Sequence, residues 1–111
     1  MADNFPLART RELNDLLRQH GIGGRLVMSA GVAALAPATL AHVLAAVRCF
    51  SNFTRDNDPY GEHDCAVLMV GAERFIWKID YYDQSLTTGS PDPGDPNVTA
   101  RVLTVMLSEE Y

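Results

Sequence analysis

Hydrophobic positions follow a helical spacing in two stretches of the first half of the chain. Between residues 6 and 19, three leucines fall on one stripe while the charged positions lie elsewhere. Pro6 suits a first helical turn and Gly21 suits a helix end, so this stretch predicts a helix. Residues 37–50 repeat the spacing and predict a second helix. Its apolar positions are Leu40, Val43, Leu44, Val47 and Phe50.

The second half begins with the pattern of a β-hairpin. Residues 65–70 are an uninterrupted apolar run, and residues 73–82 alternate between apolar and polar side chains. Gly71 and Ala72 between them suit a two-residue turn with glycine in its first central position. The alternation places Phe75, Trp77, Ile79 and Tyr81 on one face of the sheet. A further short strand is predicted at residues 24–30.

The rest of the second half reads as turns followed by a helix. Residues 51–64 and 83–95 are rich in Gly, Pro, Ser, Asn and Asp, which are typical of turns. Asp95 and Pro96 resemble a helix start, and Val98, Val102, Val105 and Met106 then keep a helical spacing. We therefore expect a single α+β domain over residues 1–111, with the order α-β-α-β-β-α. Its three-stranded, mainly antiparallel sheet would carry the helices on the Phe75/Trp77 face.

The amino-acid composition is that of an ordinary globular protein. The 111 residues are 47% hydrophobic and 21% charged, which is ordinary for a globular domain. No apolar run is long enough to span a bilayer, and the first ten residues lack the pattern of a signal peptide, so we expect a cytoplasmic protein. Cys49 and Cys65 do not form a metal-binding or redox motif. We expect them to be buried or half-buried small hydrophobes, and we expect no cofactor.

The net charge of −5 is unevenly distributed. Residues 1–50 carry five Arg against three acidic residues, whereas residues 51–111 carry four basic residues against eleven acidic ones. A general nucleic-acid binder needs a basic footprint, so this function is disfavoured. The acidic half would attract a basic protein surface or serve solubility.

The predicted hairpin register yields one candidate for catalysis. If Val70 pairs with Glu73, then Cys65 faces Lys78, and His63 lies opposite Asp80 on the face away from Trp77. Residues facing each other across two strands have Cβ atoms about 5 Å apart, so His63 and Asp80 would hydrogen-bond. A histidine beside a carboxylate is suited to acid–base chemistry near neutral pH. The alternative is a salt bridge that only fixes the end of the hairpin.

Metal binding by the loop at residues 56–64 is a weaker alternative. Its carboxylates and amides are hard oxygen ligands, but their spacing is not that of an EF-hand. Asx turns would account for the same residues without an ion, and we expect no metal site.

The two polar loops together are acidic and contain tyrosine. Carboxylates and tyrosines on loops stiffened by proline are suited to docking against a protein, and carboxylates spaced like phosphates can occupy a basic groove. We expect the contacts to come from residues 56–64 and 80–95. The expected contact residues are Asp56, Asp58, Tyr60, Glu62, Asp83, Asp92 and Asp95.

Three blocks of sequence resemble a bacterial family known only as a domain of unknown function. They are NDPYGEHD at residues 57–64, WKIDYYD at residues 77–83 and GSPDPGDP at residues 89–96. Members of that family are small stand-alone proteins, often encoded on plasmids or other mobile elements. The resemblance implies no activity, cofactor or catalytic residue. It implies an accessory protein of a mobile element, a setting in which regulators and counter-defence inhibitors are frequent.

Three hypotheses follow from the sequence. The first is a non-enzymatic inhibitor or modulator of a basic, nucleic-acid-handling protein, acting through the acidic loops. The second is a small hydrolase-like or metal-dependent enzyme centred on His63 and Asp80. The third is a plasmid or transcription accessory regulator, which the acidic net charge fits poorly.

Overall fold

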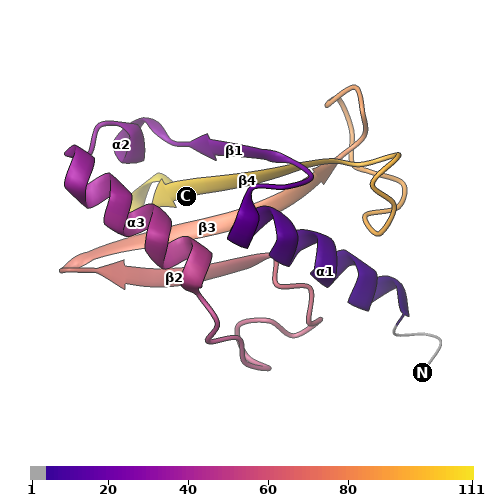
Figure 1. Ribbon diagram of the computed structural model, residues 1–111, viewed down its shortest axis with the longest axis horizontal. Coiled ribbons are helices and arrows are strands. Elements are labelled where there is room, and N and C mark those ends of the chain that lie inside the picture. Colours follow the sequence, from indigo (N-terminus) through magenta and orange to yellow (C-terminus); the bar gives the residue numbers. More distant parts are fainter. Residues whose placement is uncertain (1–4) are drawn as a thin grey trace.

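The computed structural model describes residues 5–111, with side chains from Leu7 onward; residues 1–4 of the predicted domain lie outside the described residues. The chain forms a small α+β fold in which three helices and the first strand precede three consecutive strands (Figure 1). The elements are α1 (Phe5–His20), β1 (Arg25–Met28), α2 (Ala30–Ala33), α3 (Pro37–Cys49), β2 (Cys65–Val70), β3 (Glu73–Tyr82), β4 (Ala100–Leu107) and the 3-10 helix η2 (Ser108–Glu110).

The β2–β3 hairpin has the predicted bounds and the predicted register. Val70 pairs with Glu73, and Cys65 pairs with Lys78. Gly71 has a φ of +61°, whereas Ala72 is not among the residues with positive φ. A positive φ at the first central position only is the signature of a type II′ turn, whose twist matches that of the strands.

The predicted helix after Pro96 is wrong, because residues 100–107 form β4 instead. This strand lies in the interior of a four-stranded sheet with the order β1-β4-β3-β2, so the expected sheet of three strands is also wrong. β4 runs antiparallel to β3 and parallel to β1. Arg101, Leu103 and Val105 are buried at every second position, which is the period of a strand.

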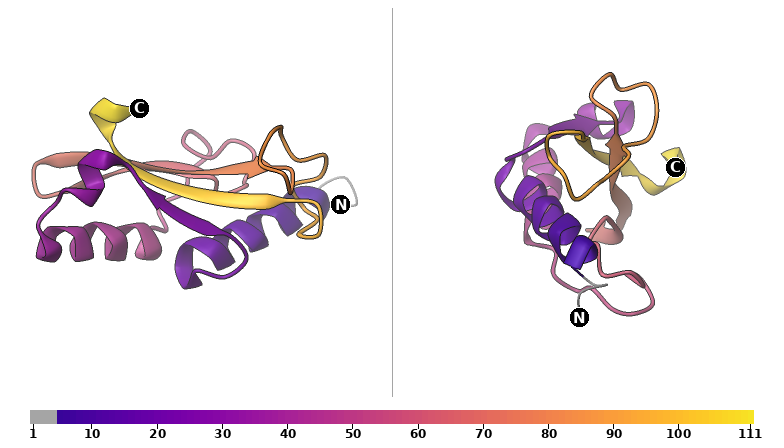
Figure 2. Two further views of the ribbon diagram at one scale, coloured as in Figure 1. Left: turned by 90° about the horizontal axis from the view of Figure 1, so that it is seen from above. Right: turned by 90° about the vertical axis from the view of Figure 1, so that its right-hand side faces the viewer.

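The helices α1 and α3 pack on one face of the sheet, as predicted. The core between them contains Leu17 of α1, Val43 and Val47 of α3, and Phe75 and Trp77 of β3. Figure 2 (left) shows both helices on one side of the sheet and η2 on the other. We call the side away from α1 and α3 the open face; Cys65, Val67 and Met69 of β2, together with their β3 partners Lys78, Ile76 and Arg74, belong to it.

Candidate functional site

The structure separates His63 from Asp80, so their predicted pairing is wrong. His63 has a φ of +54°, which turns the chain out of the strand direction just before β2 begins at Cys65. Its Nδ1 lies 2.8 Å from Oδ1 of Asp15 in α1, and its Nε2 lies 3.6 Å from Oδ2 of Asp58. Asp80 instead pairs with Lys78, whose Nζ lies 2.6 Å from Oδ2 of Asp80.

His63 holds the loop of residues 50–64 against the core through ring stacking and hydrogen bonds. Its ring stacks on Phe53 with centroids 3.8 Å apart and planes 5° apart, and Phe53 meets Trp77 edge-on. The backbone N–H of His63 donates to Asp58, which is itself buried. These contacts use both nitrogens and one face of the imidazole, so the geometry gives His63 a structural role in positioning this loop.

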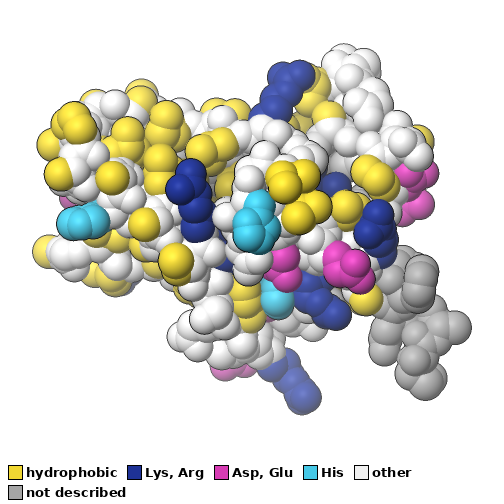
Figure 3. Space-filling model, viewed as in Figure 1, with side chains coloured by type: hydrophobic (Ala, Val, Ile, Leu, Met, Phe, Trp, Pro, Cys, Tyr) yellow, Lys and Arg dark blue, Asp and Glu magenta, His cyan; other side chains and the backbone are white. Residues whose placement is uncertain are grey.

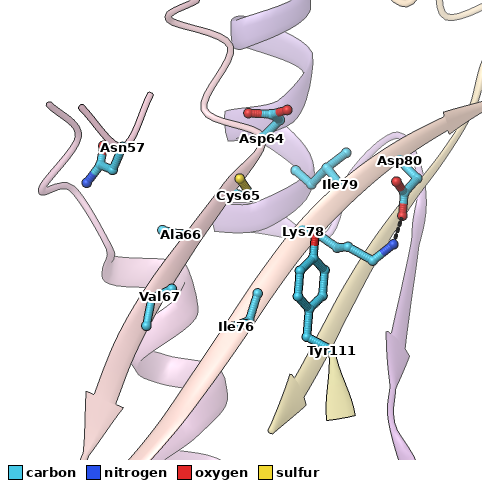
Figure 4. Close-up of a pocket in the computed structure, with 10 residues that line it drawn as sticks. All are labelled: Asn57, Asp64, Cys65, Ala66, Val67, Ile76, Lys78, Ile79, Asp80 and Tyr111. Atoms are coloured by element: carbon cyan, nitrogen blue, oxygen red, sulfur yellow. Dashed lines mark hydrogen bonds and ion pairs between the residues drawn. The ribbon is translucent and has the colours of Figure 1, made fainter. Parts of the chain in front are cut away.

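The other three members of the predicted cluster line a pocket on the open face. Its volume is about 460 Å³, and Cys65, Lys78 and Asp80 stand at one end of it (Figure 4). Val67 and Ile76 form its apolar floor, and the remaining lining residues are Asn57, Asp64, Ala66, Ile79 and Tyr111. A concave, mainly apolar surface with a few polar groups is the general form of a small-ligand site.

The side chains in this pocket are poorly suited to nucleophilic catalysis. Partial desolvation of the thiol, together with the carboxylates of Asp64, Asp58 and Asp80, raises the pKa of Cys65, and a thiol is reactive only as the thiolate. The hydrogen bond from Lys78 to Asp80 raises the pKa of Lys78, so this amine stays protonated. The expectation that the cysteines are buried is wrong, since Cys49 and Cys65 are both exposed free thiols.

A buried polar network lies between α1 and the ends of β3 and β4. At its centre is Asn14, which is fully buried. Its Nδ2 donates to the hydroxyl of Tyr81 at 2.8 Å and to the backbone oxygen of Glu62 at 3.0 Å. Its Oδ1 accepts a hydrogen bond of 2.8 Å from Nε of Arg101. Burial, followed by the hydrogen bond to Glu62, raises the pKa of Tyr81, so its hydroxyl remains a donor.

This network reaches both polar loops. The Tyr81 hydroxyl donates to Oε1 of Glu62 at 2.7 Å, which holds the loop of residues 50–64. The guanidinium of Arg101 also donates to the backbone oxygen of Pro93, which holds the loop of residues 83–99. Arg101 and Asn14 were missed by the sequence reasoning, because a buried arginine and asparagine interrupt the apolar patterns that mark a core.

Three of the seven predicted contact residues hold their own loops in place. Asp58 is buried against His63, and Glu62 is bound to Tyr81. Asp83 accepts hydrogen bonds from Thr88, Ser85 and the backbone of Thr87. Their carboxylates are therefore engaged within the protein.

The other four predicted contact residues are directed toward solvent to different degrees. Asp56 and Asp92 are exposed, Asp95 is half-buried, and Tyr60 is 72% exposed. Asp92 and Asp95 also form Asx turns by accepting from Gly94 and Asn97, which fixes their directions.

The two loops lie at the same end of the sheet but extend toward opposite edges of it. Loop 50–64 enters β2, and loop 83–99 connects the end of β3 to the start of β4. Viewed from that end, loop 83–99 lies in the upper part of the view and loop 50–64 at the bottom (Figure 2, right). The structure therefore provides two acidic surfaces at one end of the molecule rather than one continuous patch.

Within residues 5–111, no group of three or more His, Cys, Asp or Glu side chains is arranged to hold a metal ion. In the same part of the chain, every helix is too short or too polar to cross a membrane.

Comparison with known protein families gives a match over most of the chain. A family model described as protein of unknown function (DUF3768) matches residues 28–110, which run from the last residue of β1 to the last residue of η2. No curated protein and no solved structure matches the chain.

Proposed function

Because the chain belongs to this DUF3768 family of proteins of unknown function, whose description assigns no activity, we propose a function from the site alone. We propose that the protein is a non-enzymatic binding protein that modulates a basic, nucleic-acid-handling protein. The contacts are made by the loops 50–64 and 83–99. The observation that carries the proposal is the buried network of Asn14, Tyr81 and Arg101, which fixes both loops to one rigid base.

Rigid loops favour binding because little conformational entropy is lost on association. Besides the central network, each loop has hydrogen bonds of its own. In loop 50–64, Asn57 accepts from the backbone of Thr54 and donates to the backbone oxygen of Asn52. In loop 83–99, Ser90 and Thr99 are joined by their hydroxyls, and Thr99 donates to the backbone oxygen of Asp92. Each loop thus presents its side chains in a fixed arrangement.

The exposed side chains define the chemistry of the partner. Tyr60 offers a large amphipathic surface of the kind that is enriched at protein interfaces. Asp56, Asp92 and Asp95 carry negative charge at the same end of the molecule, which attracts a surface rich in Lys and Arg. A nucleic-acid-handling protein has such a surface, and occupying it would compete with nucleic acid. An anti-defence inhibitor encoded by a mobile element would act in this manner.

The enzyme hypothesis depended on the predicted pairing of His63 with Asp80, and these two side chains have other partners. Acid–base catalysis by His63 needs an imidazole nitrogen directed at a substrate, yet both nitrogens face carboxylates of the protein. Asp80 faces the pocket but is paired with Lys78. The binding hypothesis requires no such group.

The test is a capture experiment followed by measured affinities. The protein is immobilised, incubated with a bacterial host lysate, and the captured proteins are identified by mass spectrometry. The affinity of the captured protein is then measured for Asp56→Asn/Tyr60→Ala in one loop and for Asp92→Asn/Asp95→Asn in the other. Each double variant should weaken binding about tenfold or more, since a tenfold loss corresponds to about 1.4 kcal/mol. Added DNA should compete with wild-type binding.

The matched control is Glu73→Gln/Glu109→Gln, which removes two exposed carboxylates outside the loops. This variant should bind like the wild type. The proposal fails if the loop variants bind as tightly as the control, or if the only captured proteins bind with an affinity that does not change with salt concentration.

A further inference from the structure

The pocket on the open face has the size and the lining of a small-molecule site. Its volume of about 460 Å³ falls within the range of roughly 300–1,000 Å³ that is usual for small-ligand pockets. Asn57 lies on the outer side of β2 and Tyr111 lies next to β3, so these two residues form opposite walls (Figure 4). Val67 and Ile76 pair across β2 and β3 and form the floor between the walls. The side chain of Asn57 is held by two hydrogen bonds within its own loop, so this wall is preformed.

One end of the pocket carries an uncompensated negative charge. Asp80 is paired with Lys78, whose Nζ lies 2.6 Å from Oδ2 of Asp80, so these two charges offset each other. Asp64 makes no hydrogen bond or ion pair with another of the described residues. Its pKa is raised because the carboxyl group is partly buried and because the carboxylate of Glu62 repels it. A partly buried carboxylate without a partner is destabilised, and a cation bound beside it relieves this cost.

The ring of Tyr111 adds an aromatic surface to the pocket. Tyr111 is 82% exposed, so most of its ring is available to cover a ligand. An aromatic ring attracts a cation over its face, and it also packs against apolar groups. An anion would instead meet the charge of Asp64, and the ammonium group of Lys78 already has a carboxylate partner. The floor, the ring and the free carboxylate are therefore complementary to a molecule that has an apolar body and one positive charge.

Negative charge is concentrated near the pocket and away from α2 and α3. Residues 26–47, which include α2 and most of α3, contain no Asp or Glu. Figure 3 shows hydrophobic side chains gathered over α2 and α3, on the side of the sheet that the helices cover. Beside the pocket, by contrast, the carboxylates of Asp58, Glu62 and Asp80 all act on Asp64. A cation is therefore attracted to the pocket rather than to the helices.

We propose that this pocket binds a small organic cation, with a protonated amine beside Asp64 and an aliphatic or aromatic body on the floor formed by Val67 and Ile76. This binding activity goes beyond the proposed modulation of a basic protein. The four exposed loop residues that define the surface for that partner do not line the pocket. Occupation of the pocket therefore depends on a different set of side chains.

The first test is an NMR titration of the wild-type protein with small probes. The cationic probes are phenethylamine and hexylamine, their neutral counterparts are 2-phenylethanol and 1-hexanol, and the anionic probe is 3-phenylpropionate. Both amines should cause saturable shifts of the backbone amides of Val67 and Ile76. Each amine should bind about tenfold or more tightly than its alcohol, because only the amine carries a charge opposite to that of Asp64. The anionic probe should bind most weakly.

The second test changes the charge of the pocket in both directions. Asp64→Asn should weaken binding of the amines about tenfold and leave binding of the alcohols unchanged. Asp56→Asn is the matched control, because it removes the same charge from an exposed position that does not line the pocket. Lys78→Met leaves Asp80 without its partner and should tighten binding of the amines several-fold. A gain in affinity is a result that damage to the fold does not produce, and the spectrum of each variant shows whether it is folded.

The third test concerns the apolar floor. Val67→Ser should weaken binding of hexylamine several-fold, because it removes apolar surface from the floor. Met69→Ser is the control, since Val67 and Met69 are 54% and 55% exposed on the same face of β2 but only Val67 lines the pocket. The control variant should bind hexylamine like the wild type.

The proposal is overturned if neither amine causes saturable shifts, or if each alcohol binds as tightly as its amine. Tighter binding of 3-phenylpropionate would assign the pocket to anions and also overturns it. Equal affinities of Asp64→Asn and Asp56→Asn for the amines would place the cation elsewhere. These titrations need no partner protein, so their failure is distinguishable from a failure of the capture experiment.

Discussion

Asn14 has no exposed surface, yet its amide group uses both of its ends in hydrogen bonds. Replacing it by Leu removes the acceptor of the buried Arg101 and the donor to Tyr81. A buried charge that loses a partner is strongly destabilising. We expect Asn14→Leu to lower the free energy of unfolding by about 2–4 kcal/mol, measured by urea denaturation.

Asn97→Leu is the control for this substitution, because Asn97 is an exposed asparagine in loop 83–99. It should change the free energy of unfolding by no more than about 0.5 kcal/mol. Equal stability of the two variants would show that the network around Asn14 contributes little.

A second prediction for a single residue concerns the pKa of the Asp83 carboxyl group. Hydrogen bonds from the Thr88 hydroxyl, the Thr87 backbone and the Ser85 hydroxyl hold the pKa of its carboxyl well below the usual range. A pKa lowered by folding stabilises the native state above the ordinary value near 4, and this stabilisation is lost as the pH falls through the folded pKa. Thr88→Val should therefore shift the Asp83 midpoint upward in a carboxyl NMR titration.

Thr39→Val serves as the comparison, since Thr39 is exposed in α3 and distant in sequence from loop 83–99. Its Asp83 midpoint should equal that of the wild type. An unchanged midpoint in Thr88→Val would mean that the hydroxyl does not set this pKa.

At the scale of elements, the sequence predicts those parts of the fold in which the apolar positions follow only one spacing, either that of a helix or that of a strand. Residues 73–82 alternate cleanly, and Gly71 marks the turn, so the register of the hairpin was predictable. The apolar residues between positions 98 and 107 fit both a helical spacing and a strand spacing. Val98, Val102 and Val105 fit a helix, whereas Leu103, Val105 and Leu107 fit a strand. The buried charge of Arg101 concealed the strand, and pairing with β1 and β3 decided the outcome.

The contact between the β1 end and β4 gives a prediction for one glycine. A Cβ atom on Gly24 would lie 2.5 Å from the backbone oxygen of Arg101 and 2.7 Å from Cδ2 of Leu17. Since the backbone of β4 is fixed by its neighbours on both sides, Gly24→Ala must displace one strand. We expect a loss of about 1–3 kcal/mol in the free energy of unfolding, measured by thermal or urea denaturation.

Gly89→Ala provides the matched substitution in open surroundings, where the nearest atom to a new Cβ is 3.9 Å away. This substitution should leave the free energy of unfolding nearly unchanged. If Gly24→Ala and Gly89→Ala lower the free energy of unfolding equally, the close approach at Gly24 is not the reason that a glycine is required there.

At the scale of the whole molecule, the candidate site was less predictable than the fold. The composition correctly placed acidic side chains on the two loops, because turn-forming residues and exposure go together. It did not show that Asp58, Glu62 and Asp83 are engaged within the protein, since those contacts depend on long-range packing. The position of His63 depended on one positive φ, which no periodicity reveals.

The sheet order also predicts how stability is distributed over the molecule. β4 is paired on both sides and has a buried residue at every second position, whereas all four residues of β1 are exposed. Amide hydrogen exchange measured by NMR should therefore be at least about tenfold slower at Leu103 and Val105 than in β1. Similar protection in both strands would indicate that the sheet opens as one unit.

The interior position of β4 has a consequence for synthesis of the protein on the ribosome. β1 is made early but has no strand to pair with until β4, more than seventy residues later, has been translated. At about 5–20 residues per second, this delay lasts several seconds. During it, α1, α3 and the hairpin can collapse together, but the edge of β3 that pairs with β4 remains without a partner strand. A nascent chain halted before residue 100 should therefore recruit chaperones, and one released after residue 107 should not.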